Sequence, residues 1–136
     1  AYAAAAHGRM VDQRCTEISL ADQMVYVFRN GKVAYSCKTI SGRPVEGRST
    51  PTGAYFIKEH NTHRVLKGEN YETPVDSWVR ITWSGTGFHA APWQSWSSWT
   101  KDYYKVRGSH GCLNLEPSVA KKIYDMVKYR EAVFIH

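Results

Sequence analysis

The dipeptide Asn30-Gly31 constrains the fold of this chain more strongly than any other short stretch. It lies between two runs of strand-forming residues, 24–29 and 32–40. Asn-Gly favours a tight hairpin turn, because both central positions of that turn need a positive φ. The sequence therefore predicts an antiparallel β-hairpin over residues 24–40.

Other parts of the chain repeat the pattern of a short strand followed by a turn. We expect strands at 15–20, 54–58, 78–83 and 132–135. Residues 59–73 are polar and weakly patterned, and we expect a long irregular excursion there. A stripe of apolar residues at helical spacing, beginning with Pro117, predicts one helix to about residue 128. The expected fold class is mostly β, with one helix near the C-terminus.

Length and composition narrow the class of protein. A chain of 136 residues is close to one ordinary domain, and 43% hydrophobic with 22% charged residues is typical of a globular protein. No apolar run approaches the roughly 18 residues of a transmembrane helix. The formal net charge of +6 favours anionic partners such as nucleic acid, a membrane or a cell-wall polymer, without choosing among them.

The N-terminus differs from the rest of the chain. Residues 1–12 begin with an alanine-rich stretch and are expected to be a disordered extension or linker. An Ala-x-Ala pattern there also fits the end of a cleaved secretion signal. We therefore expect one folded domain over residues 13–136.

Residues that can carry chemistry concentrate at 109–114, which read Ser-His-Gly-Cys-Leu-Asn. A thiol becomes a nucleophile as the thiolate, so Cys112 needs a base nearby, and His110 and His89 are candidates. Backbone N–H groups around Gly111 can converge on an oxyanion. The pattern favours an acyl-transfer site. The alternative is that Cys112 is a small buried apolar residue and that His110 is a loop histidine with ordinary partners.

These residues resemble the signature of the L,D-transpeptidases, the YkuD-type catalytic domains. The resemblance consists of His89, a spacer of 19 residues, and the Ser-His-Gly-Cys-x-Asn element at 109–114. The spacer is slightly longer than is usual in that family. Thr50-Pro51-Thr52-Gly53 and the hairpin at 24–32 resemble family features further upstream. The resemblance implies a β-sandwich-like L,D-transpeptidase catalytic domain over residues 13–136, with a lid over the active site.

The resemblance also implies an activity. Cys112 would attack the carbonyl of the L-configured third residue of a peptidoglycan stem tetrapeptide, release D-Ala and hold an acyl-thioester. An amine from a second stem peptide would resolve the thioester and form a 3→3 cross-link, whereas water would resolve it in an L,D-carboxypeptidase. β-Lactams of the carbapenem type would be inhibitors. The expected protein is an extracytoplasmic monomer of the cell wall, secreted or anchored through an upstream segment, with no cofactor and no nucleic-acid partner.

Roles follow from the resemblance position by position. His89 would be the general base, and the backbone carbonyl of residue 90, here Ala90, would orient it. The N–H groups of Gly111 and Cys112 would form the oxyanion hole. His110 would border the acyl-donor site. The family position of Ala90 usually holds Gly or Ser, but a carbonyl oxygen can come from any residue.

The expected substrate-binding residues are Ser109, Asn114, Trp93 and Tyr104. Asn114 would also brace the loop of Cys112. Trp93 and Tyr104 belong to residues 91–108, the expected lid. Three-residue spacing of Trp93, Trp96 and Trp99 predicts a short helix, with two of the three packing the lid onto the sandwich.

The remaining cysteines are candidates for a disulfide. Three cysteines minus one nucleophile leave Cys15 and Cys37, which fall in the first and third expected strands. An oxidising exterior permits a bridge between them if those strands lie side by side. The alternative is two buried thiols at unrelated positions.

Two other functions remain open from the residues alone. His89, His110 and Cys112 could form a zinc site if they converged, which would make the protein a zinc hydrolase. The basic surface and many aromatic residues could instead belong to a non-catalytic cell-wall-binding module. Against the binding module, binding alone gives no reason for a His-Gly-Cys loop. The zinc site needs all three side chains to converge, and we expect no metal.

Overall fold

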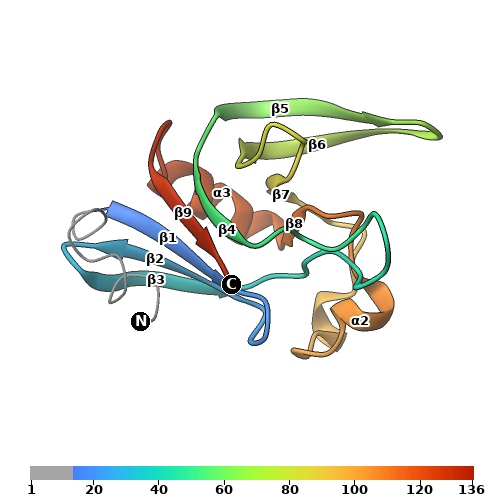
Figure 1. Ribbon diagram of the computed structural model, residues 1–136, viewed down its shortest axis with the longest axis horizontal. Coiled ribbons are helices and arrows are strands. Elements are labelled where there is room, and N and C mark those ends of the chain that lie inside the picture. The colour runs from blue at the N-terminus through green and yellow to red at the C-terminus, as the bar shows by residue number, and fades with distance from the viewer. Residues whose placement is uncertain (1–13) are drawn as a thin grey trace.

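The computed structural model describes residues 14–136, which form two β-sheets and three helical segments (Figure 1). The first sheet consists of β1 (Arg14–Ser19), β2 (Met24–Arg29), β3 (Lys32–Lys38), β4 (Gly53–Phe56) and β9 (Ala132–Ile135), in the order β3-β2-β1-β9-β4. The second consists of β5 (Glu59–Gly68), β6 (Tyr71–Arg80), β7 (Gly87–Ala90) and β8 (Leu113–Leu115), in that order. The helical segments are η1 (Trp96–Ser98), α2 (Tyr104–Arg107) and α3 (Pro117–Met126). The expected extension at 1–12 lies outside the described residues.

The first hairpin is confirmed. β2 and β3 pair antiparallel, and the turn between them has φ of 55° at Asn30 and 74° at Gly31. Both angles lie in the left-handed region that Asn and Gly tolerate best. β1 then pairs with the other edge of β2 and runs parallel to β9, so the two ends of the domain meet in one sheet.

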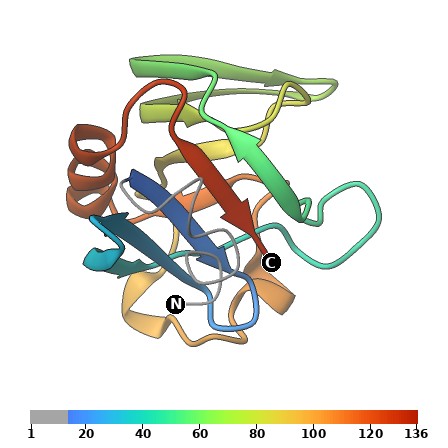
Figure 2. The same cartoon turned by 60° about the vertical axis from the view of Figure 1, so that its left-hand side comes forward.

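The main core lies between the two sheets and α3. Buried apolar side chains come from β2 (Val25, Val27), β6 (Val79), β8 (Leu113) and α3 (Ile123). The predicted C-terminal helix is confirmed, with Pro117 at its start and Ala120 and Ile123 buried. Figure 2 shows α3 at the left, flanking the sheets. The predicted mostly β, sandwich-like fold is therefore confirmed. None of the helices within residues 14–136 is long and apolar enough to cross a membrane.

The expectation of an irregular excursion at 59–73 is wrong. β5 and β6 form one long antiparallel hairpin, paired from Glu59↔Arg80 to Gly68↔Tyr71, whose end projects beyond the sandwich (Figure 1). None of the ten residues of β5 is buried, and only Val75, Trp78 and Val79 are buried in β6. With water on most sides, the hairpin carries no alternation of apolar and polar residues that a sequence pattern could detect.

The stretch 78–83 is only partly a strand. Ladder pairing ends at Arg80, and the chain then turns through residues 81–86 towards β7. Ile81 is still buried, but Trp83 is 72% exposed. The predicted strand is therefore confirmed for residues 78–80 and not for residues 81–83.

The proposed disulfide between Cys15 and Cys37 is also wrong. Both cysteines are free and buried. β2 lies between their strands, with Cys15 opposite Phe28 and Cys37 opposite Val25, so the two strands are about 9.5 Å apart. That exceeds the Cα separation that a disulfide can span. Cys15 packs in a separate small cluster with Phe28 and Phe134, whereas Cys37 belongs to the main core.

We therefore expect three free thiols per chain when the protein is unfolded in denaturant without reductant and titrated with a thiol reagent. Burial raises the pKa of Cys15 to about 11 and that of Cys37 to about 12, so neither reacts in the folded protein at neutral pH. The Cys112→Ala variant is the matched control, with two thiols expected. A count of one thiol in the unaltered protein would contradict the strand order described above.

Candidate active site

β7 and β8 bring the two halves of the predicted site together. They are parallel neighbours in the second sheet, and their register places His89 opposite Asn114. Both side chains are buried, with 3% and 1% of their surface exposed. The loop of Cys112 enters β8 directly, so pairing of two short strands positions a histidine from one segment beside a cysteine loop from another.

His89 is held as a neutral hydrogen-bond acceptor. Its Nδ1 donates to the carbonyl oxygen of Ala90 at 2.8 Å, so Nε2 carries the free lone pair. Asn114 Nδ2 donates to that nitrogen at 3.4 Å. Burial lowers the pKa of His89, against the opposing effect of the Ala90 carbonyl. At neutral pH the imidazole is therefore uncharged and able to accept a proton at Nε2.

Cys112 is a half-buried neutral thiol in this conformation. Its Sγ donates to the carbonyl oxygen of Gly85 at 3.5 Å. Burial raises the pKa of Cys112 to about 11, while the Gly87 N–H and the charge of Arg80 act in the opposite direction. Because the thiol bonds to Gly85 and His89 Nε2 bonds to Asn114, both groups must change partner before a proton can pass between them.

The carbonyl of Gly85 belongs to a turn that Arg80 holds in place. The Arg80 guanidinium donates to the carbonyls of Thr82 and Trp83, each at 2.9 Å, and to Glu59 Oε2 at 3.0 Å. The sequence assigns Arg80 no role beyond its place in the expected strand at 78–83. Nothing in the local pattern identifies a turn-holding arginine, because the Glu59 partner comes from another strand.

The loop before Cys112 is fixed by two hydroxyl groups. Ser109 Oγ accepts from Gly111 N–H at 3.1 Å and donates to the Cys112 carbonyl at 2.5 Å. Thr50 Oγ1 accepts from Gly42 N–H at 2.8 Å and donates to the Gly111 carbonyl at 2.7 Å. Gly111 has a φ of +136°, which favours glycine. The hydroxyl of Ser109 thus shapes the loop, and Gly111 N–H has to be released before it can bind an oxyanion.

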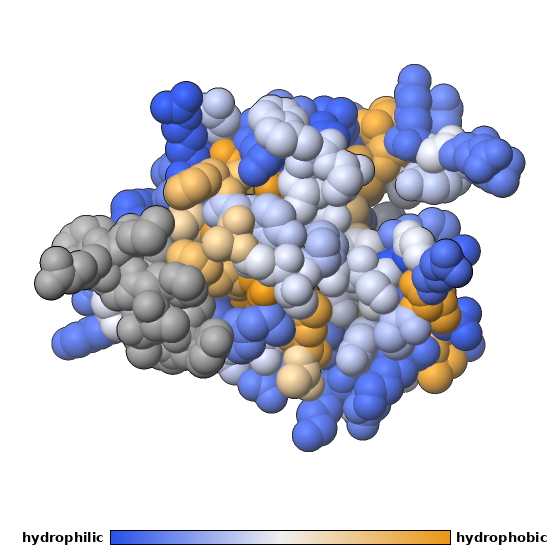
Figure 3. Space-filling model, viewed as in Figure 1, coloured by the Kyte–Doolittle hydropathy of each residue, from blue (hydrophilic) through white to orange (hydrophobic). Residues whose placement is uncertain are grey.

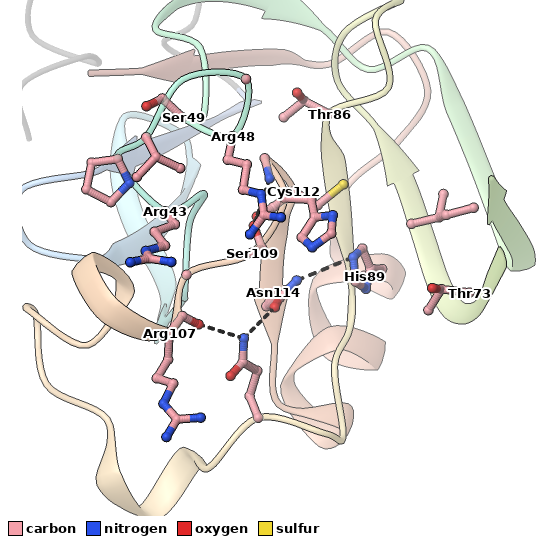
Figure 4. Close-up of a pocket in the computed structure, with 18 of the residues that line it drawn as sticks. Arg43, Arg48, Ser49, Thr73, Thr86, His89, Arg107, Ser109, Cys112 and Asn114 are labelled. Atoms are coloured by element: carbon pink, nitrogen blue, oxygen red, sulfur yellow. Dashed lines mark hydrogen bonds between the residues drawn. The ribbon is translucent and has the colours of Figure 1, made fainter. Parts of the chain in front are cut away.

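Asn114 and Gln94 form a chain of hydrogen-bonded amides that ends at His89. Figure 4 shows Asn114 between His89 and Arg107. Asn114 Oδ1 accepts from Gln94 Nε2 at 3.1 Å, and Gln94 Nε2 also lies 3.1 Å from the carbonyl of Arg107. Asn114 therefore links the histidine to the segment expected as the lid. Sequence reasoning did not identify Gln94, because a lone glutamine carries no signal before its partners are known.

Cys112, His89 and His110 line one cavity of about 1610 Å³. In the space-filling view the surface is hollowed between the projecting end of the β5–β6 hairpin and residues 43–49 (Figure 3). Tyr71 at the end of that hairpin meets the exposed ring of His110 edge to face, with centroids 5.4 Å apart. The end of the hairpin therefore forms one wall of the cavity. Residues 91–108, the only lid that the sequence indicated, form another.

The three tryptophans of residues 91–108 divide as expected: two pack the segment onto the fold and one lines the cavity. Trp96 and Trp99 donate to the carbonyls of Ala91 and Thr39, at 3.0 and 2.8 Å, which confirms that two of the three pack the segment. Trp93 is 55% exposed, lines the cavity and lies 5.8 Å from the His89 ring. The short helix expected through all three tryptophans is only the single turn η1 at Trp96–Ser98.

The assignment of Tyr104 to the cavity is wrong. Its neighbour Tyr103 is the tyrosine in the cavity lining, where its hydroxyl accepts from Ser95 N–H at 3.3 Å and lies 3.4 Å from Gln94 Oε1. Tyr104 begins α2, and adjacent positions on a helix face different directions. The sequence pattern could not distinguish Tyr103 from Tyr104. Which of these two side chains faces the cavity depends on the residue at which α2 begins, and so short a helix has no pattern that fixes its start.

Comparison with known proteins points to one family. The family model described as the YkuD L,D-transpeptidase catalytic domain matches residues 14–135. L,D-transpeptidase 2 of Mycobacterium tuberculosis is 34% identical over 116 residues, which is 76% of this chain and 26% of that protein. The crystal structure of a cysteine-to-serine mutant of an Enterococcus faecium L,D-transpeptidase has a TM-score of 0.85 and 34% identity, covering 93% of this chain and 51% of that one.

The chain matches the catalytic part of its relatives. It spans less than half of the length of the two M. tuberculosis relatives, 26% of L,D-transpeptidase 2 and 45% of L,D-transpeptidase 1. The NMR structure of the isolated E. faecium catalytic domain has a TM-score of 0.78 and 34% identity, covering 93% of this chain and 98% of that domain. The chain therefore belongs to the family of YkuD-type L,D-transpeptidase catalytic domains.

Proposed function

We propose that the protein is a cysteine peptidoglycan L,D-transpeptidase that forms 3→3 cross-links. The observation that carries this function is the pairing of β7 with β8, which presents the accepting Nε2 of His89 and the Cys112 thiol to one large cavity. A neutral imidazole of fixed tautomer beside a thiol is the arrangement that nucleophilic acyl transfer requires.

In the first half-reaction the Cys112 proton passes to His89 Nε2, and the sulfur attacks the carbonyl of the third stem residue. The N–H groups of Gly111 and Cys112 receive the negative charge that develops on the carbonyl oxygen. The C–N bond to D-Ala then breaks, and the imidazolium returns its proton to the leaving amine. The products are free D-Ala and an acyl-thioester on Cys112.

In the second half-reaction the side-chain amine of another stem peptide attacks the thioester. His89 takes a proton from that amine, the C–S bond breaks, and the proton returns to the sulfur. The Ala90 carbonyl supports both halves, because its bond to Nδ1–H fixes the tautomer and stabilises the imidazolium that forms in each. Water in place of the amine would give L,D-carboxypeptidase activity, the alternative outcome at the same site.

Relatives of this chain support covalent inhibition at Cys112. One is the E. faecium catalytic domain acylated by ertapenem, 33% identical with a TM-score of 0.75. Another is an L,D-transpeptidase in complex with imipenem, 30% identical with a TM-score of 0.79. We infer that carbapenem-type β-lactams acylate Cys112. Peptidoglycan lies outside the cytoplasm, so we also infer that the protein acts at the cell wall, secreted or anchored through an upstream segment. We propose that it acts there as a monomer.

The zinc hydrolase and the non-catalytic wall-binding module are less well supported. Within residues 14–136 no three His, Cys, Asp or Glu side chains are placed to share a metal ion. A binding module gives no reason for a buried histidine held in one tautomer beside a thiol.

The test is incubation with a defined disaccharide-tetrapeptide, followed by mass spectrometry of the products. We expect free D-Ala and a dimer whose mass equals two donors minus one D-Ala. A product of donor mass minus D-Ala plus water would assign the carboxypeptidase outcome. Absence of any D-Ala release would contradict both.

A further inference from the structure

The arginines of the described residues fall into two groups, those whose side chain has a carboxylate or an aromatic ring as a partner and those whose side chain has neither. Eight arginines lie within residues 14–136. Arg14 and Arg29 pair with Glu131, and Arg64 and Arg80 pair with Glu59. Arg130 lies over the ring of Tyr129 at 5.5 Å. Five of the eight side chains therefore have a carboxylate or an aromatic ring as a partner.

The remaining three, Arg43, Arg48 and Arg107, all line the cavity of Cys112. Their side chains are exposed and have neither a carboxylate nor a ring partner among the described residues. Glu46 is the only acidic side chain in the lining of this cavity in the described part of the chain. A wall with three positive charges and one negative charge attracts anions, and its guanidinium groups remain free to bind them.

The backbone that carries these arginines is well anchored. Arg43 N–H donates to the Ser109 carbonyl at 3.0 Å, and Arg48 N–H donates to the Val45 carbonyl at 3.0 Å. The Arg48 carbonyl lies so close to Gly42 that a Cβ there would approach it to 1.8 Å. The loop is thus fixed against the Cys112 segment, and Figure 4 shows the Arg48 side chain pointing into the cavity towards Cys112.

Guanidinium groups bind carboxylates through two parallel hydrogen bonds, which gives both strength and orientation. The donor of the proposed reaction carries a carboxylate at the required place. The α-carboxylate of its terminal D-Ala is separated from the scissile carbonyl only by the nitrogen and the α-carbon of that residue. When Cys112 attacks, this carboxylate must therefore lie close to the thiol.

We propose that Arg48 binds the terminal carboxylate of the donor peptide, and that Arg43 and Arg107 add the positive field that draws it into the cavity. The proposal rests on the proposed function and adds its specificity: the substrate class is a peptide with a free carboxylate on the residue after the scissile bond. A donor whose terminal D-Ala is amidated places a neutral group against Arg48 and is used poorly.

The test compares two synthetic donors that differ only at the terminus, one ending in D-Ala and the other in D-alaninamide. Formation of the Cys112 thioester is followed by mass spectrometry. We expect the unaltered protein to prefer the free acid by about 10- to 100-fold in kcat/KM, the range of a hydrogen bond to a charged group. In Arg48→Gln this ratio should fall towards one, through a higher KM for the free acid.

Arg130→Gln is the matched control, since it removes the same charge from a position outside the cavity lining. It should retain the preference. Arg43→Gln and Arg107→Gln should each weaken the reaction of the free acid by a smaller factor that disappears at high salt, because exposed charges act through a screened field. Iodoacetamide is uncharged, so its rate of alkylation of Cys112 measures the reactivity of the thiol alone. Each acylation rate is divided by this rate.

The outcomes separate this proposal from the proposed function. If the unaltered protein acylates with both donors equally, or if Arg48→Gln keeps the full preference, the carboxylate role of Arg48 is refuted and the L,D-transpeptidase activity stands. If the unaltered protein acylates with neither donor, the proposed function is itself refuted, and the specificity built on it is refuted with it.

Discussion

Cys112→Ala is expected to abolish D-Ala release and to prevent any covalent adduct with a carbapenem. The variant has no sulfur to attack the carbonyl, so the loss should reach the detection limit of the assay. The fold should survive, because the thiol is half-buried and gives up one weak hydrogen bond to Gly85, a change of about 1 kcal/mol in the free energy of unfolding. Mass spectrometry of the intact protein and thermal unfolding measure the two effects.

Cys15→Ala is the control for this prediction. Cys15 lies in the small cluster with Phe28 and Phe134, on strand β1 of the other sheet, so its removal should leave both D-Ala release and the adduct in place. An adduct mapped to Cys15 or Cys37, or turnover that survives in Cys112→Ala, would mean that the thiol role has been assigned to the wrong residue.

Features encoded by neighbouring residues could be predicted from the sequence. The Asn30-Gly31 turn needs only the φ preferences of two residues, and α3 needs only Pro117 and an apolar stripe. The grouping of His89 with the 109–114 segment follows from a family signature, and the pairing of β7 with β8 brings the two together. In each case the information lies within a short stretch or a known motif.

Features that depend on distant partners could not be predicted. The β5–β6 hairpin is stabilised by pairing between its own exposed strands, which leaves little apolar periodicity to detect. The error over Cys15 and Cys37 has a similar origin, because only the strand order reveals that β2 separates them. The roles of Arg80 and Gln94 depend on Glu59, on turn carbonyls and on Asn114, which are brought near them only by the complete fold.

His89→Ala is expected to slow acylation by about 10²- to 10⁴-fold, the usual contribution of a general base. His89 has the required lone pair at Nε2, whereas the exposed His110 ring packs edge to face against Tyr71. His110→Ala should therefore act mainly through donor binding and raise KM. This substitution removes the His110 ring from the cavity wall. It leaves the tautomer of His89 unchanged, because the Ala90 carbonyl fixes that tautomer.

The dependence of acylation on pH distinguishes the two histidines most clearly. Because burial lowers the pKa of His89, the base stays uncharged at neutral pH, and the unaltered protein should lose activity only as the pH falls through that lowered pKa.

Without His89 the reaction depends on thiol ionisation alone, and burial raises the pKa of Cys112 to about 11. The residual rate of His89→Ala should therefore rise about tenfold per pH unit up to that pKa, because each unit increases the thiolate fraction tenfold. Single-turnover acylation of both variants across pH measures this. If His110→Ala shows the steep rise while His89→Ala keeps the flat profile, His110 is the base and His89 only borders the donor site.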